Sequence, residues 1–201
     1  MKESIWGKGD KLTLKVLNKL QLKGNWLDLA AGDGRYVSKL LKKVDSLVAT
    51  DIDRKALRKL LYIVSKEKKC KIKTKVFDIT KKFPFKDKTF DGVFCAGTLH
   101  LFPKKVLIKI LAEIGRVLKP KGIVVIDFAT DLRRYFPNSK PKTFKNEPKY
   151  KLNSAKQFLK NSFKDYNVKI YNSKFTDDLT NIPKYGWVSK GNFVLMVAKK
   201  P

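Results

Sequence analysis

Short apolar runs alternate with amphipathic stretches along most of this chain. The runs have the length of buried strands, and three of the first four carry an acidic residue at or near the C-terminal end. Apolar side chains at helical spacing lie between them and predict helices that cover a sheet. The predicted strands are Trp26–Ala30, Ser46–Asp51, Ile72–Asp78, Phe90 with the loop that follows it to Phe102, and Gly122–Phe128. The predicted helices are Asp10–Leu22, Arg35–Val44, Arg54–Lys66 after a cap at Asp53, and the stretch from Pro103 to Pro120.

The last third of the chain has a different pattern. Ser154–Phe163 predicts a helix, and Asn167–Tyr171 and Asn192–Ala198 predict an antiparallel pair of strands. Residues 131–152 contain three prolines and no apolar period, which predicts a long basic loop that could serve as a substrate lid. Residues 1–201 fit one domain. We expect an α/β fold: a single doubly wound Rossmann-like domain with a seven-stranded, mostly parallel sheet, strand one at its centre and one antiparallel strand near the C-terminus.

The turn after the first strand carries the strongest chemical signal. It has the sequence Asp28-Leu-Ala-Ala-Gly-Asp-Gly34, and Gly32 and Gly34 permit positive φ and close approach of a ligand. A nucleotide-like ligand could sit over such a turn. The dinucleotide fingerprint fails because Val37 stands at its third glycine. Asp51 ends the second strand at about the offset of a ribose-binding carboxylate.

These segments together resemble the class I methyltransferases that use S-adenosylmethionine. Asp28–Gly34 is similar to the first motif of that family, Asp51 to its ribose-binding acid, and Phe77–Ile79 to its adenine-contacting segment. The segments 83–93 and 114–122 resemble those that flank the fourth strand and precede the fifth. The pattern is most similar to the ubiquinone-biosynthesis-like branch, methyltransferase type 11.

The resemblance implies S-adenosylmethionine as the cofactor. Ala30 replaces the usual first glycine, so we expect a slightly tighter pocket. The residues that the resemblance assigns to cofactor binding are Asp28, Ala30, Gly32, Gly34, Tyr36, Asp51, Ile52, Asp78, Ile79, Cys95 and Ala96.

His100 is the catalytic candidate. It is the only histidine of the chain, it follows the fourth strand, and its ordinary pKa suits a base near neutral pH. The alternative is a helix-entry histidine satisfied by backbone groups. A base is needed only if the acceptor loses a proton, and positioning can supply much of the rate. The residues expected on the substrate side are Trp6, Phe102, Arg133, Arg134, Tyr135 and Trp187.

Missing motifs narrow the chemistry. The fourth strand is not followed by the Asn/Asp-Pro-Pro-aromatic signature, and no Pro-Cys nucleophile is present. The family resemblance therefore argues against transfer to exocyclic base amines by that motif and against covalent cytosine C5 chemistry. One histidine and two distant cysteines, Cys70 and Cys95, supply neither a zinc site nor a disulfide framework, so we expect no metal. No apolar run could span a membrane and Met1–Lys11 does not resemble a signal peptide, so a cytoplasmic location is expected.

The net charge of +28 bears on the acceptor. A lysine excess without balancing glutamate attracts polyanions, but the compositional bias of a genome gives the same excess with no functional patch. Residues 131–152 interleave cations and rings, which suits phosphate contact and base stacking, or the rings pack back on the domain. Three hypotheses follow: a methyltransferase with an anionic acceptor, RNA narrowly favoured; a small-molecule methyltransferase; and a non-catalytic S-adenosylmethionine-binding module. The oligomeric state stays open.

Overall fold

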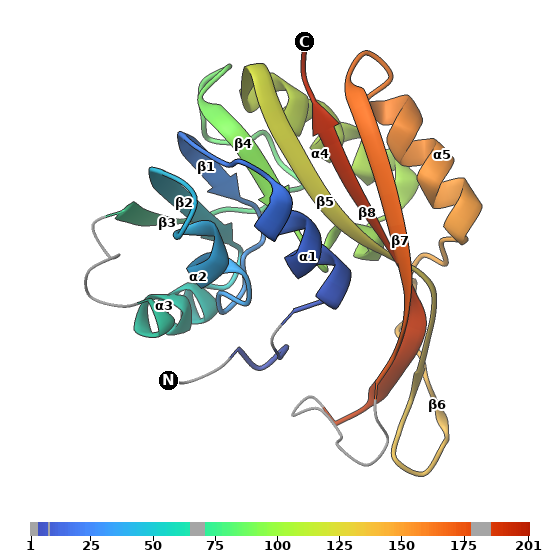
Figure 1. The fold of residues 1–201 in the computed structure, drawn as a ribbon. Coiled ribbons are helices and arrows are strands. Elements are labelled where there is room, and N and C mark those ends of the chain that lie inside the picture. The colour runs from blue at the N-terminus through green and yellow to red at the C-terminus, as the bar shows by residue number, and fades with distance from the viewer. Residues whose placement is uncertain (1–3, 8, 65–70, 178–185) are drawn as a thin grey trace.

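A central sheet with the strand order β3-β2-β1-β4-β5-β8-β7 organises the molecule, and the short strand β6 pairs with β5 (Figure 1). The computed structural model describes residues 4–7, 9–64, 71–177 and 186–201. The strands are β1 (Asn25–Asp28), β2 (Ser46–Asp51), β3 (Ile72–Val76), β4 (Phe90–Cys95), β5 (Leu118–Tyr135), β6 (Pro141–Lys142), β7 (Asn167–Thr176) and β8 (Val188–Lys199). The helices are α1 (Lys11–Lys19), α2 (Val37–Leu40), α3 (Arg54–Ile63), the 3-10 turn η2 (Leu99–Leu101), α4 (Lys104–Val117) and α5 (Leu152–Ser162).

The strand directions confirm the predicted fold class. Neighbouring strands from β3 to β5 are parallel, and β8 runs antiparallel to both β5 and β7. The seven-strand path therefore contains one reversed strand, near the C-terminus, and β6 adds a short eighth strand antiparallel to β5. The predicted central place of strand one needs correction: β4 is in the middle of this path and β1 is its neighbour.

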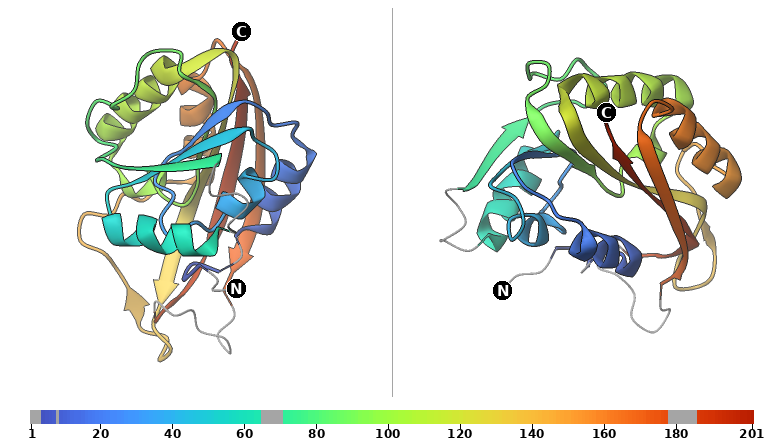
Figure 2. Two further views of the ribbon diagram at one scale, coloured as in Figure 1. Left: turned by 90° about the vertical axis from the view of Figure 1, so that its left-hand side faces the viewer. Right: turned by 45° about the horizontal axis from the view of Figure 1, so that its top comes forward.

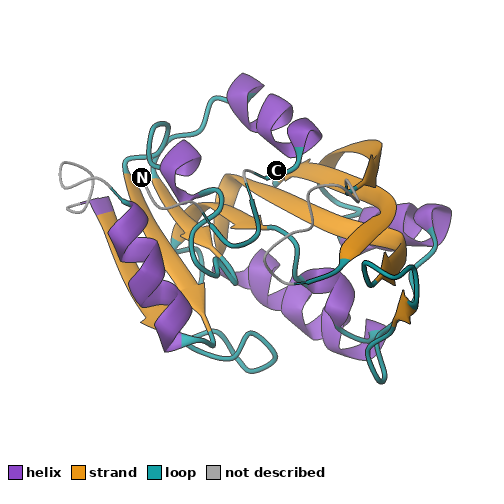
Figure 3. Ribbon diagram, turned by 90° about the horizontal axis from the view of Figure 1, so that it is seen from below, coloured by secondary structure: helices purple, strands orange, loops and turns teal. Residues whose placement is uncertain are grey.

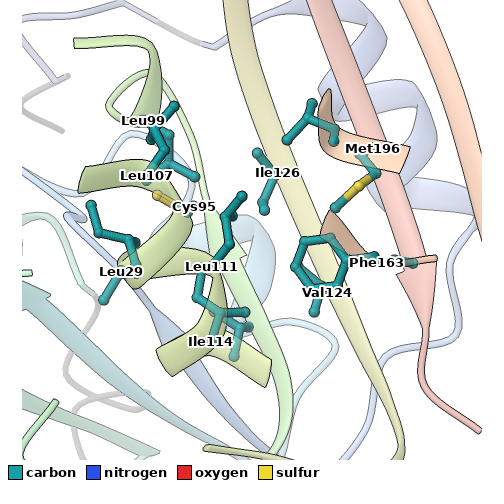
Figure 4. Close-up of a cluster of buried hydrophobic side chains, with 14 of the residues drawn as sticks. Leu29, Cys95, Leu99, Leu107, Leu111, Ile114, Val124, Ile126, Phe163 and Met196 are labelled. Atoms are coloured by element: carbon teal, nitrogen blue, oxygen red, sulfur yellow. The ribbon is translucent and has the colours of Figure 1, made fainter. Parts of the chain in front are cut away.

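Helices cover both faces of the sheet and create two cores. The helices α1, α2 and α3 bury leucine and valine against one face, together with Trp26. The helices α4 and α5 bury the opposite face, where Leu107, Leu111 and Leu159 meet β4, β5 and β8. Figure 2 shows α1 and α4 on opposite sides of the sheet, and Figure 4 shows the second core between α4 and β5. Burial of both faces explains the apolar runs Trp26–Leu27 in β1, Val93–Cys95 in β4 and Ile123–Ile126 in β5.

Local sequence signals predicted some helix boundaries correctly and others incorrectly. Asp53 caps α3 as predicted, since its carboxylate accepts from the Lys55 backbone N–H at 2.7 Å. The predicted helix over 35–44 is wrong in length, because only Val37–Leu40 is α-helical. Gly34, at φ 93°, holds the preceding turn against Leu60, and the chain enters the helix only after Tyr36. None of the described helices is long and apolar enough to cross a membrane.

The prediction of a loop over 131–152 is wrong for part of its length. Residues 133–135 continue β5 and pair with residues 188–190 of β8, and Pro141–Lys142 pairs back as β6. A register shift between Thr130 and Arg133 marks a bulge in β5. The distal half of β5 thus extends beyond β1 to β4 together with β7 and β8, and it becomes a wall of the site described next (Figure 1).

Candidate functional site

The turn after β1 forms the cofactor end of the site. It lies at the C-terminal ends of β1, β2 and β4, on the side of the sheet that faces the viewer in Figure 3. Ala30, Gly32 and Gly34 all have positive φ, at 57°, 56° and 93°. A Cβ on Gly32 would meet no atom within 4 Å, whereas one on Gly34 would lie 2.9 Å from Leu60 Cγ. Gly34 therefore serves packing against α3, and Gly32 borders open space that a ligand can use.

Asp51 connects this turn to the second strand. Its Oδ2 accepts from the Gly32 backbone N–H at 2.8 Å, and its Oδ1 accepts from the Asp53 backbone N–H at 2.9 Å. Two carboxylate oxygens have about four acceptor positions, so lone pairs remain for the hydroxyls of a ribose. The neighbouring Ile52 side chain is 69% exposed and offers an apolar surface beside the acid. These features fit the ribose and adenine parts of S-adenosylmethionine.

Asp28 lies beneath the same turn. Its side chain is buried, and burial first, then the charge of Asp51, raises its pKa to about 8. The pKa of Asp78, which follows β3, is shifted in the opposite direction. Its carboxylate accepts hydrogen bonds from the Thr80 backbone N–H and hydroxyl, both at 2.8 Å, and these lower its pKa.

Three side chains expected at the cofactor lie in the core. Ile79 and Cys95 are buried, and burial raises the pKa of the Cys95 thiol (Figure 4). The Tyr36 ring packs edge-on against Phe94 at 5.1 Å, and its hydroxyl accepts from the Asp10 N–H at 2.8 Å. Their apolar surface is used for packing, so none presents a side chain to a ligand. Ala96 remains half-buried at the site.

The second acid of the turn, Asp33, holds the N-terminal segment over the site. Its Oδ1 accepts from the Ser4 hydroxyl at 2.5 Å and its Oδ2 accepts from the Ile5 N–H at 2.7 Å. Gly9 packs so closely on Tyr36 that a Cβ there would lie 2.6 Å from the ring. The segment before α1 is thereby fixed, and it places Trp6 on the site. The sequence analysis did not single out Asp33; a second acid inside a glycine turn was the available signal.

A cavity of about 1220 Å³ adjoins the cofactor turn. It starts at Arg35 and Gly97 and runs between the start of α1, the distal half of β5, and the ends of β7 and β8. Its aromatic walls are Phe175 stacked on Phe193, with ring centroids 4.2 Å apart, and Phe144 edge-on to Trp187 at 5.6 Å. Asp51 and Asp78 do not line it. The cavity therefore lies beside the cofactor turn and not over these two acids.

The predicted substrate residues divide between this cavity and other places. Trp6, Arg134 and Trp187 line it, and Arg133 lines a smaller adjoining cavity. Phe102 instead packs against the core, and its carbonyl accepts from the Tyr150 hydroxyl at 2.6 Å. Tyr135 faces Lys190, whose Nζ is 5.0 Å from the ring centroid. Neither Phe102 nor Tyr135 lines the two cavities.

His100 lines both cavities, from η2. It is 8% exposed, and burial first, then the charge of Arg134, lowers its pKa to about 4. The imidazole is therefore neutral at pH 7 and a weaker base than free histidine. Its Nδ1 has no hydrogen-bond partner among the described residues, so the alternative of a ring fully satisfied by backbone groups is wrong for that atom.

Asp127 is a buried acid whose charge interacts with Arg35 and Asp10 of the cavity wall, and the sequence analysis mentioned it only within a strand. It is buried beneath α1, where its Oδ2 accepts from the Thr13 hydroxyl at 3.2 Å. Burial raises its pKa to about 6, and the charge of Arg35 opposes the rise. The signal was available: an acid interrupts the apolar run from residue 122 to residue 129. Of the described residues, no group of histidine, cysteine or acids is placed to hold a metal.

The basic segment has intramolecular partners. Arg134 Nη1 pairs with Glu147 Oε2 at 2.6 Å, and both side chains are largely buried. The Lys142 ammonium lies over the rings of Phe136, Phe144 and Trp187, at 5.2, 4.9 and 5.9 Å. Two of the cations expected to contact phosphate therefore have partners within the protein, whereas the rings of Phe136 and Phe144 are exposed.

Comparison with known families agrees with this geometry. Residues 27–122 match the model of a family described as methyltransferase domain. That segment contains the turn after β1, Asp51, Asp78 and His100. The match and the fold together support a class I methyltransferase that uses S-adenosylmethionine, without confirming the type 11 branch. No curated protein matches the chain.

Solved structures share the fold across almost the whole chain. The PH0226 protein of Pyrococcus horikoshii OT3 is 20% identical, with a TM-score of 0.65 over 94% of this chain and 89% of its own. A complex of DhpI with SAH is 17% identical, with a TM-score of 0.64 over 94% of this chain and 83% of its own. A SAM-dependent methyltransferase of Thermotoga maritima is 15% identical, with a TM-score of 0.64 over 94% and 88%. At these identities the likeness concerns the fold alone.

Proposed function

We propose that this protein transfers the methyl group of S-adenosylmethionine to a small-molecule acceptor bound in the 1220 Å³ cavity. The cavity itself carries the proposal, because it joins the cofactor turn at Arg35 and Gly97 and has stacked aromatic walls. Cavities with apolar walls and a few convergent polar groups are typical of small-molecule sites. The cofactor assignment rests on the turn, on Asp51 and on the family match.

The charges around the cavity favour an acceptor with an anionic group and a planar body. Its lining contains six cations and three carboxylates, so positive charge exceeds negative charge by three. The cations are Lys11, Lys15, Arg35, Arg134, Lys145 and Lys174, and the carboxylates are Asp10, Glu147 and Asp177. Aromatic side chains stack on planar ligands, and the surplus cations attract a carboxylate or phosphate.

His100 borders the acceptor in this proposal, and catalysis rests mainly on positioning. With a pKa near 4, its imidazole is unprotonated throughout the neutral range and can accept a hydrogen bond. So weak a base removes a proton poorly from an alcohol or amine. Holding acceptor and sulfonium in line, away from water, is the contribution that the cavity can supply.

RNA is the second candidate acceptor, on the strength of the net charge of +28. The partners of Arg134 and Lys142 remove two phosphate contacts from that alternative. A non-catalytic S-adenosylmethionine-binding module is the third candidate.

The decisive experiment incubates the protein with methyl-labelled cofactor and cell extract separated into small molecules, RNA and protein. Label in the small-molecule fraction is expected; label in RNA alone, or in none, would replace the proposal.

A pair of variants connects the result to the cavity. Phe175→Ala removes one ring of the aromatic wall and should raise the acceptor KM at least several-fold while leaving the affinity for the cofactor unchanged. Tyr62→Ala is the matched control, because Tyr62 is an exposed ring on α3, away from the cavity. Equal kinetics for both variants would show that the acceptor binds elsewhere.

A further inference from the structure

A second, smaller cavity of about 270 Å³ lies beside the acceptor cavity. The two share His100, Ala129, Leu132 and Glu147 as lining residues, so they adjoin across one wall. The rest of the smaller cavity is formed by the bulge of β5 and by the segment that leads into α5. It is therefore adjacent to the place of methyl transfer without being part of the cofactor turn.

The bulge that shapes this cavity is held from both sides. Asp131 has a φ of 49°, a left-handed conformation that is unusual for a residue other than glycine. Its Oδ2 accepts from the Leu152 N–H at the start of α5 and from Asn192 Nδ2 on β8, both at 3.1 Å. Opposite it, a Cβ on Gly191 would lie 2.7 Å from the Thr130 carbonyl oxygen. Bulges held in this way often redirect side chains at functional sites.

Three polar atoms around the cavity have no partner. Among the described residues, five buried side-chain atoms lack a hydrogen bond, and three of them belong to residues that line this cavity: His100 Nδ1, Thr130 Oγ1 and Glu147 Oε1. Thr130 is 1% exposed and His100 is 8% exposed. Buried polar groups are nearly always paired, so this cluster indicates a ligand that supplies the missing hydrogen bonds.

The unpaired atoms define what that ligand offers. Glu147 Oε2 already pairs with Arg134, and its Oε1 can only accept, so the ligand needs a donor. Arg133, Lys149 and Lys151 also line the cavity, but an anionic oxygen has no proton to donate to Glu147 Oε1. A cation would meet Arg133 and the Arg134 charge that already lowers the pKa of His100. The Tyr150 hydroxyl is bonded to the Phe102 carbonyl, so this residue lines the cavity mainly as an apolar surface.

We infer that the smaller cavity is a subsite for a neutral hydrogen-bond-donating group of the acceptor, a hydroxyl or a carboxamide. This group is not the methylated atom; it fixes the acceptor by donating to Glu147 Oε1 while His100 and Thr130 complete its hydrogen bonds. The inference rests on the proposed function, because the two cavities share a wall. Its test needs neither cofactor nor turnover, so the two can fail separately.

The test uses phenol against toluene, two probes of nearly the same shape that differ in one hydroxyl. Because His100 is the only histidine, an imidazole nitrogen spectrum of ¹⁵N-labelled protein reports the site without assignment of other residues. Phenol is expected to shift the His100 nitrogen signals in a saturable way, and toluene to leave them unchanged. No shift with phenol, or the same shift with both probes, would overturn the subsite.

Two variants locate the effect. Thr130→Val and Glu147→Gln are each expected to weaken phenol binding about tenfold, the change in affinity that corresponds to one lost hydrogen bond. Glu113→Gln is the control, because Glu113 also pairs with an arginine, at 2.7 Å, but lies outside both cavities. Unchanged phenol affinity in Thr130→Val and Glu147→Gln would overturn the inference. If either variant fails to fold, the comparison of phenol with toluene on the parent protein still tests whether the subsite exists.

Discussion

Asp28 and Asp51 show how single residues shape the cofactor end. Asp51 accepts a backbone N–H on each of its two carboxylate oxygens. Asp28 is buried beside it, and burial first, then the charge of Asp51, raises the pKa of Asp28 to about 8. Both causes disfavour the charged form of the Asp28 carboxyl group.

The raised pKa of Asp28 predicts how the stability of the protein depends on pH. The folded-state pKa of Asp28 exceeds its unfolded value of 3.8, so its contribution is complete below that value and is lost as pH rises through about 8. His100 opposes this fall only weakly above pH 7, because its imidazole is neutral in the folded state and mostly neutral in the unfolded state, where its pKa is 6.5. The free energy of unfolding of the cofactor-free protein should fall by roughly 1 kcal/mol per pH unit between pH 6.5 and 8. Asp28→Asn should flatten that decline.

Urea unfolding followed by circular dichroism at several pH values in this range measures both slopes. Parallel slopes for the parent protein and Asp28→Asn would show that Asp28 is already ionised at neutral pH. The Asn side chain keeps nearly the same shape, so a change confined to the slope separates titration from packing.

Residue patterns in the sequence predicted the cofactor end better than the acceptor end. Glycine spacing and strand-terminal acids are local, so Gly32, Gly34 and Asp51 could be identified from short segments. The acceptor cavity draws on residues from Trp6 to Phe193, and their proximity depends on pairing between distant strands. Glu147, Thr130 and Ser173 carry no local signal, which is why the sequence analysis did not name them.

At the scale of elements, the distal half of β5 decides the shape of the site. The sequence of residues 131–135 has two arginines and little apolar alternation, so it predicted a loop. It is a strand because residues 188–190, more than fifty positions later, supply its ladder hydrogen bonds. Strand propensity depends strongly on such context. The helices, whose hydrogen bonds and apolar faces are local, were located correctly apart from the length of α2 and the ends of the others.

The N-terminal segment is an element that depends on one side chain. Asp33→Ala removes both hydrogen bonds to Ser4 and Ile5 and should release the segment from the turn. We expect faster tryptic cleavage before α1 and a higher KM for the acceptor, since Trp6 lines its cavity. Asp45→Ala, which removes an exposed carboxylate bonded to the Gly24 N–H, is the control. Equal cleavage of the two variants would contradict the role of Asp33.

Arg116 joins α4 to the segment before β4. Its guanidinium pairs with Glu113 and Asp87 at 2.7 Å and donates to the carbonyls of Phe83 and Phe85. A lysine cannot reproduce this fork, so Arg116→Lys should lower the free energy of unfolding by about 2 kcal/mol. Chemical denaturation measures the change, with Lys105→Ala on the same helix as an exposed control. A loss no larger than that of the control would show that the carbonyl contacts contribute little.

At the scale of the whole molecule, lysine is spread over nearly every element instead of gathering at the acceptor cavity. Such a surface attracts polyanions without selecting one of them, because contacts of lysine with phosphate are independent of sequence. The basic segment 131–152 contributes less than its composition suggests, since Arg134 and Lys142 are occupied by Glu147 and by aromatic rings. Net charge alone therefore gives RNA affinity without giving an RNA site.

If RNA binds through net charge alone, lysines in different parts of the surface should contribute equally to RNA affinity. Lys140, Lys145 and Lys149 lie in the basic segment, and Lys55, Lys59 and Lys73 lie on α3 and β3. Changing either set of three to glutamine should weaken RNA binding at 50 mM salt to a similar extent, because each removes the same charge.

The affinity for RNA should fall roughly a thousandfold or more between 50 and 200 mM salt if six or more phosphates are contacted. Filter binding over that salt range measures both quantities, and methyl transfer to the small-molecule acceptor should not be inhibited by RNA at 200 mM. If the first set alone abolishes RNA binding, the basic segment is an RNA site, and RNA replaces the small molecule as the favoured acceptor.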